Sequence, residues 1–167
     1  MIILGIDTSL RSTGYGVIEI SKGKARALDC GIIKNKPALR HSECLKRISG
    51  GIEQLVQLYK PEQVSIESTF VSKNAKTAMI LGMARGAAIS PVAKEDLPIY
   101  EYSPKSAKLA VVGTGTASKE QVAVMVGQIL NCDITGLKDD ATDALALAIC
   151  HWQSLSHPIL SQKIKEI

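Results

Sequence analysis

The sequence predicts an α/β domain in which a mixed sheet of five strands is flanked by helices on both faces. Short runs rich in β-branched residues alternate with longer stretches of helical periodicity. The first three runs follow one another across tight turns, whereas helices separate the later ones, which is typical of a mixed sheet. The 167 residues, 46% of them hydrophobic, fit one such domain.

The first half of the chain is expected to hold four strands and one helix. Its first strand is a continuous apolar run, typical of burial on both faces, and a turn around Gly23 separates the second strand from the third. The helix has apolar residues at helical spacing and closes before Pro61. In order, we expect strands over residues 2–6, 14–20 and 25–33, a helix over about 39–59, and a strand over 63–67.

The second half is expected to hold the fifth strand and four helices. Small residues fill the first of these helices, so that another element or a second subunit can approach it closely at Gly82 and Gly86. Ser103-Pro104 begins a short helix, and a capping box at Ser118 begins the next. In order, we expect a helix over about 75–93, a strand over 97–102, a short helix from 104, and helices over 118–130 and 139–155.

Residues 1–157 are expected to form the single domain and residues 158–167 a C-terminal tail. No apolar stretch approaches the ~20 residues that a membrane span needs. A secretory signal is not recognisable either, so a cytoplasmic location is expected. The four cysteines are far apart, which predicts free thiols.

The formal net charge of +4 is modest, but its distribution is uneven. Basic residues dominate from 21 to 47, where the only acids are Asp29 and Glu43, and from 71 to 94, where there is no acid. Such positive surface is typical of a protein that binds a polyanion. A solvated mixed surface is the alternative.

Four acidic residues are expected to converge at one end of the sheet. Asp7 ends the first strand and Glu67 ends the fourth, and these strands would be neighbours in a sheet of this kind. Asp140 and Asp143 share a face of the final helix. Repulsion would raise their pKa values unless divalent cations bind, and carboxylate oxygens suit Mg²⁺ or Mn²⁺. The alternative is that the aspartates are ordinary acids of a helix N-terminus and that Glu67 faces solvent.

Two divalent ions in such a site can activate a water and stabilise the leaving oxygen in phosphodiester cleavage. The order of the elements is typical of the ribonuclease H type of fold. Five motifs carry a more specific resemblance: GIDTSLRSTGYGVIE, VSIESTFVSKNAKTA, LGMARGAAI, VVGTGTASKEQV and DDATDALALAICH. In order and spacing, from residue 2 to about 152, they resemble the RuvC family of crossover junction endodeoxyribonucleases.

This resemblance implies a ribonuclease H-like fold and a homodimer that resolves four-way (Holliday) DNA junctions in recombination and DNA repair. It implies two Mg²⁺ ions per subunit, which Mn²⁺ can replace, paired symmetric nicks with 5′-phosphate ends, and the branch-migration proteins RuvA and RuvB as partners. By position, it assigns the catalytic and metal-binding roles to Asp7, Glu67, Asp140 and Asp143.

The resemblance also implies DNA contacts. Phe70 takes the place of an aromatic residue that stacks on an unpaired base at the junction centre, although a core phenylalanine anchoring a loop is the alternative. Thr8-Ser9 depart from the Pro-Gly common in the family, which leaves open how closely DNA or metal approaches there. The candidate phosphate contacts are Lys73, Asn74, Arg85, Lys105, Lys108 and Lys119.

Three other functions remain open from the sequence. A YqgF-like nuclease of the same fold would act on RNA, but the region of Phe70 and GMARG favour the RuvC-like interpretation. An actin-like or sugar-kinase ATPase would explain GIDTS before a Gly-rich hairpin, yet it needs two lobes of this kind. A catalytically silent junction-binding module would retain the fold, and the presence of all four acids argues against it.

Overall fold

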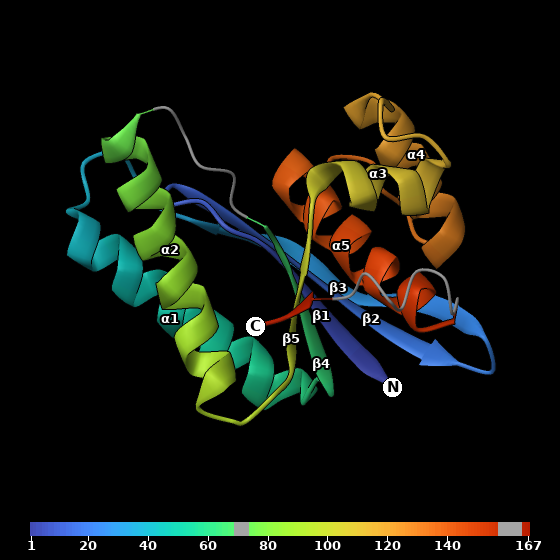
Figure 1. Cartoon of the computed structure of the whole chain (residues 1–167), viewed down its shortest axis with the longest axis horizontal. Coiled ribbons are helices and arrows are strands. Elements are labelled where there is room, and N and C mark those ends of the chain that lie inside the picture. The colour runs from blue at the N-terminus through green and yellow to red at the C-terminus, as the bar shows by residue number, and fades with distance from the viewer. Residues whose placement is uncertain (69–73, 157–164) are drawn as a thin grey trace.

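A computed structural model describes residues 1–68, 74–156 and 165–167 of the chain. It shows a mixed sheet between two helical layers, which confirms the predicted fold class (Figure 1). The strands, in the spatial order β3-β2-β1-β4-β5-β6, are β1 (Ile2–Asp7), β2 (Ser12–Ser21), β3 (Lys24–Lys34), β4 (Gln63–Glu67), β5 (Ile99–Tyr102) and β6 (Lys165–Glu166). The helices are α1 (His41–Tyr59), α2 (Ala75–Ala93), α3 (Pro104–Val112), α4 (Lys119–Leu130) and α5 (Asp139–Ser156).

The strand β1 lies in the interior of the sheet. It pairs antiparallel with β2 and parallel with β4, and Ile3, Leu4 and Ile6 are at most 1% exposed, as a continuous apolar run predicts. Since Ile6 lies opposite Ile66 in the parallel register, β1 and β4 end side by side. The predicted neighbourhood of these two strand ends is thus confirmed.

Helices α1 and α2 cover one face of the sheet, and α3, α4 and α5 cover the other (Figure 1). Helix α5 packs directly on the backbone of β1 and β2. A Cβ atom added to Gly5 would lie 2.0 Å from the Ala144 carbonyl oxygen, and one added to Gly14 would lie 1.9 Å from that of Asp140. These glycines therefore let the first turns of α5 rest on the strand that carries Asp7 and on its neighbour.

The structure differs from the sequence-based expectations in the C-terminal segment and along α2. Within the segment expected as a tail, β6 pairs antiparallel with β5, so a two-residue sixth strand joins the five predicted ones. A Cβ atom at Gly82 or Gly86 would meet nothing within 4 Å, so no described part of this chain makes the close approach predicted there. All four cysteines are free, as predicted. None of the described helices combines the length and the apolar character of a membrane span.

Candidate active site

Three of the four predicted acids line one cavity at the shared end of β1 and β4. The cavity has a volume of about 210 Å³, and Asp7, Glu67 and Asp143 lie in its wall. Lysines 108 and 119 face the same space, while α3, α4 and α5 supply an apolar lining. The remaining lining residues are Pro104, Ala107, Val122, Ala146 and Leu147.

Electrostatic coupling shows that the acids converge as predicted. Burial, a side-chain hydrogen bond with Glu67 and the negative charges of Glu67, Asp143 and Asp140 together raise the pKa of Asp7 to about 8. Burial also raises the pKa of Asp143, although Lys119 opposes the shift. In the metal-free protein, Asp7 thus holds a proton near neutral pH, chiefly because burial disfavours its charged form.

Asp140 has a neighbour that the sequence-based reasoning missed. The Ser12 hydroxyl, at the start of β2, donates a hydrogen bond to the Asp140 carboxylate. Ser12 is one of several small polar residues after β1, and no sequence pattern distinguished it. The contact ties the first turn of α5 to β2 at the place where Gly14 lets the helix approach.

Two of the predicted phosphate-binding lysines stand beside the acids. The Lys119 ammonium lies 3.2 Å from Asp139 Oδ2 and 3.6 Å from Asp143 Oδ2. Partial burial by itself lowers the pKa of Lys119, but the two aspartates outweigh it and the pKa is raised. Lys108 donates a hydrogen bond to the Ala117 carbonyl oxygen at 2.8 Å. Lys105 is exposed on α3, with its alkyl chain over Gly115.

The other predicted DNA contacts have different positions. Asn74 is the N-cap of α2 and accepts a hydrogen bond from the Thr77 N–H at 3.1 Å. Arg85 is only 8% exposed, and its guanidinium donates to the Glu67 carbonyl oxygen and to the Glu101 carboxylate. Arg85 therefore lacks the exposed guanidinium that the predicted phosphate contact requires. Phe70 and Lys73 lie outside the described residues.

Comparison with known proteins agrees with this geometry. The family model for crossover junction endodeoxyribonuclease RuvC matches residues 3–151. The chain belongs to the RuvC family. A RuvC from Protochlamydia amoebophila is 48% identical over 97% of this chain and 95% of the relative, and one from Citrifermentans bemidjiense is 42% identical over 99% and 100%.

Solved RuvC structures have the same architecture. The structure described as T. thermophilus RuvC in complex with Holliday junction substrate superposes with a TM-score of 0.88. It is 30% identical and covers 100% of this chain and 99% of that one. The ribonuclease H-like fold predicted from the order of elements is confirmed along the whole chain.

The Thr8-Ser9 departure from the usual RuvC loop has a simple structural account. Neither residue has a positive φ angle, so the backbone does not require glycine at this place. Thr13 Oγ1 donates to the Ser9 carbonyl oxygen at 2.7 Å and accepts from the Ser9 N–H at 3.4 Å, which closes the loop. The replacement is therefore compatible with the position of Asp7.

Membership of the RuvC family of nucleases implies dependence on a divalent metal ion. The donor set fits such an ion, because carboxylate oxygens are the ligands that Mg²⁺ and Mn²⁺ prefer. Within the described part of the chain, no group of three His, Cys, Asp or Glu side chains could hold an ion by itself. Mg²⁺ is commonly bound through one or two carboxylates together with substrate phosphates and waters. The site therefore fits metal ions whose coordination is completed by nucleic acid.

The raised pKa of Asp7 predicts a pH-dependent stability of the metal-free protein. Between the ordinary value of 3.8 and about 8, the folded state keeps a proton that the unfolded state has lost. The free energy of unfolding therefore falls as the pH rises through this window. Urea denaturation in EDTA at pH 5 and pH 8 should show this decline in the wild type and a smaller one in Asp7→Asn. Equal declines in both proteins would contradict the assignment.

Arg85 is expected to be important for stability. An Arg85→Met variant leaves the Glu101 carboxylate, whose side chain is 16% exposed, without this partner, and breaking such a buried pair costs about 3–5 kcal/mol. Arg26→Met is the matched control, because Arg26 pairs with Glu19 at the surface and an exposed pair contributes about 1 kcal/mol or less. Urea denaturation measures both, and similar small losses would show that the Arg85 pair is not structural.

Proposed function

We propose that this chain is a structure-selective endonuclease that resolves four-way (Holliday) DNA junctions by paired symmetric nicks in recombination and repair. The convergence of Asp7, Glu67 and Asp143 in one cavity, in a chain of the RuvC family, is the observation that carries the proposal. Relatives that cover nearly the whole chain are named crossover junction endodeoxyribonucleases, and T. thermophilus RuvC was solved with its Holliday junction substrate.

In this proposal, Asp7, Glu67, Asp140 and Asp143 hold two Mg²⁺ ions, which Mn²⁺ can replace. When bound, such ions activate a water and stabilise the leaving oxygen. In the metal-free protein, the carboxyl group of Asp7 holds a proton near neutral pH, which it would release on binding an ion. Lys119 offsets the charge of Asp143, while Lys105 and Lys108 contact phosphates and position the scissile strand.

We further propose a homodimer in the cytoplasm that cooperates with RuvA and RuvB. Two subunits related by a twofold axis would set two sites against opposite strands, so symmetric cleavage follows from the geometry. Helix α2 supports a subunit contact, since Met79 and Met83 are 69% and 40% exposed beside Gly82 and Gly86. Phe70 would stack on an unpaired base at the junction centre, and Lys73 would contact phosphate.

Substrate selectivity tests this proposal. Purified protein is incubated with a mobile four-way junction, a linear duplex and an RNA hairpin, each with Mg²⁺, with Mn²⁺ and with EDTA. We expect metal-dependent cleavage of the junction alone, with 5′-phosphate ends. Cleavage of the RNA instead would favour a YqgF-like activity, and tight junction binding without cleavage in either metal would favour a silent binding module.

A further inference from the structure

A group of basic residues lies where β3 leads into α1, at the end of the sheet that carries the acids. Lys34 is opposite Ser12 in the β2–β3 register, and Gly14 is opposite Asp7 in the β1–β2 register. Lys34 is thus two strands across and two residues along from Asp7, roughly 12 Å at the usual strand spacing and rise per residue. The connection from β3 to α1 and the α3–α4 pair lie on opposite sides of this sheet end (Figure 1).

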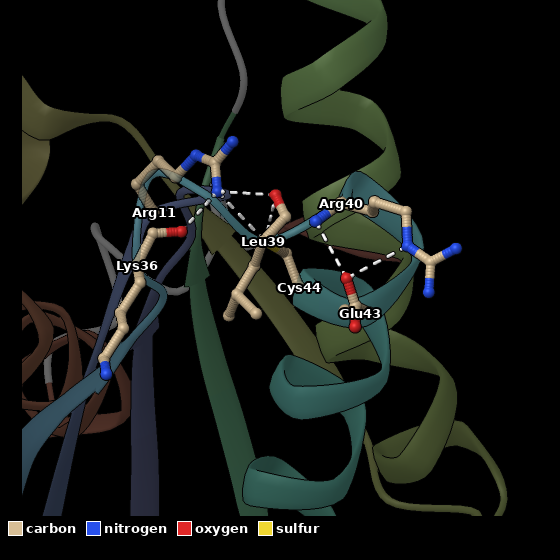
Figure 2. Close-up of polar contacts among 6 residues, drawn as sticks. All are labelled: Arg11, Lys36, Leu39, Arg40, Glu43 and Cys44. Carbon is tan, nitrogen blue, oxygen red and sulfur yellow. Dashed lines mark hydrogen bonds and ion pairs between the residues drawn. The ribbon is translucent and has the colours of Figure 1, made fainter.

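Among the described residues, no acidic side chain pairs with Arg11 of this group. Figure 2 shows Arg11 Nη1 donating to the carbonyl oxygens of Lys36 and Leu39, at 2.8 and 3.1 Å, and to Cys44 Sγ at 3.3 Å. These acceptors are all neutral, so the guanidinium keeps its full charge. By contrast, Arg40 forms an ion pair with Glu43 at 3.2 Å (Figure 2), which neutralises both.

Arg47 shows the same pattern on the first turns of α1. Its Nε donates to Asn35 Oδ1 at 2.9 Å and its Nη2 to the Lys34 carbonyl oxygen at 3.3 Å, and both acceptors are neutral. Lys34 and Lys36 are exposed, and neither forms an ion pair within residues 1–68, 74–156 and 165–167. We call Arg11, Lys34, Lys36 and Arg47 the β3–α1 basic surface; among the residues that the structure describes, its four charges have no acidic counterion.

Buried hydrogen bonds hold this surface in place. Asn35 is 2% exposed, and its Nδ2 donates to the Leu10 carbonyl oxygen at 2.8 Å. The Asn35 N–H donates to the Arg11 carbonyl oxygen at 2.9 Å. The basic surface is thereby attached to the loop that follows Asp7. A surface that is already ordered loses little conformational entropy when a ligand binds.

We propose that the β3–α1 basic surface binds the phosphate backbone of a DNA arm that leaves the active site. This inference rests on the proposed function and extends it, because the acids would lie between two phosphate-binding flanks: this surface on one side and Lys105 and Lys108 on the other. DNA carries about one negative charge per 1.7 Å and so supplies the missing counterions. An acidic protein partner would have no need to bind at the catalytic end of the sheet.

Salt-dependent binding of a four-way junction tests the proposal with a matched pair of variants. Lys34→Gln/Lys36→Gln removes two charges from the surface, and Lys22→Gln/Lys24→Gln removes two exposed charges from the β2–β3 turn, at the opposite end of the same hairpin. Each lost phosphate contact should reduce the magnitude of the negative slope of log K against log salt by about 1. We expect a decrease of about 2 for the first variant, with the largest loss of affinity at low salt, and no change for the second.

Equal slopes for the two variants would overturn the inference. If both match the wild type, the surface makes no phosphate contact; if both become shallower, net charge alone sets the affinity. Junction binding and cleavage by the wild type distinguish this outcome from failure of the proposed function. A wild type that neither binds nor cleaves junctions contradicts the nuclease proposal itself. A wild type that binds and cleaves, with equal slopes in the two variants, contradicts only the β3–α1 surface.

Discussion

An Asp7→Asn variant is expected to lose junction cleavage by roughly a thousandfold, a loss comparable to that caused by removing one preorganised electrostatic group from an active site. The negative charges of Glu67, Asp143 and Asp140 all act on Asp7. An amide cannot supply the anionic oxygen that a divalent ion requires. Single-turnover cleavage of a four-way junction in Mg²⁺ measures the loss, and Glu53→Gln, an exposed acid on α1, serves as the control.

This loss should not come from unfolding or from weak DNA binding. Because Asp7 is protonated near neutral pH in the metal-free protein, an uncharged amide replaces a largely uncharged acid, and the fold should be retained. The amide adds no negative charge near the phosphates, so junction affinity should be retained. Cleavage by Asp7→Asn at the rate of Glu53→Gln would contradict the catalytic assignment of the four acids.

A Gly14→Ala variant is expected to lose both stability and activity. The new Cβ atom would lie 1.9 Å from the Asp140 carbonyl oxygen and 2.4 Å from its carbonyl carbon. Both are backbone atoms of a helix, which cannot rotate aside as a side chain could. The first turn of α5 must therefore move away from β2, at a cost of about 1–3 kcal/mol or more. Asp140 and Asp143 would move with it, so cleavage should fall as well.

Gly50→Ala is the matched control, because a Cβ atom there meets nothing within 4 Å inside α1. Alanine in place of glycine in a helix interior should raise the free energy of unfolding by up to about 1 kcal/mol. Urea denaturation and junction cleavage are measured on both variants. Wild-type stability and activity in Gly14→Ala would show that α5 does not rest on β2 in the way described.

Much of the fold could be predicted because its determinants are local. A continuous apolar run marked β1, and capping residues at Ser103 and Ser118 marked the starts of α3 and α4. The convergence of acids was also predictable. Asp7 and Glu67 end recognisable strands that are neighbours in the sheet, and the other two acids stand at the start of a recognisable helix.

The remaining features depend on contacts between distant parts of the chain. Arg85 stands in a helix of small residues, and only the packing of α2 against the ends of β4 and β5 shows that its charge is buried with Glu101. The two residues of β6 are too few to form a pattern. Arg11 and Arg47 donate to carbonyl and amide oxygens and a sulfur, and not to acids. These acceptors are far along the chain, so the sequence does not reveal them.

We propose that two subunits of this one chain make paired nicks in a four-way junction. A supercoiled plasmid that extrudes a cruciform tests this claim directly, because both nicks must fall within the lifetime of one complex to give a linear product. We expect linear plasmid in Mg²⁺, with the ends mapping to opposite strands at symmetric positions, and no cleavage in EDTA. Nicked circles alone, or intact plasmid in every metal, would contradict it.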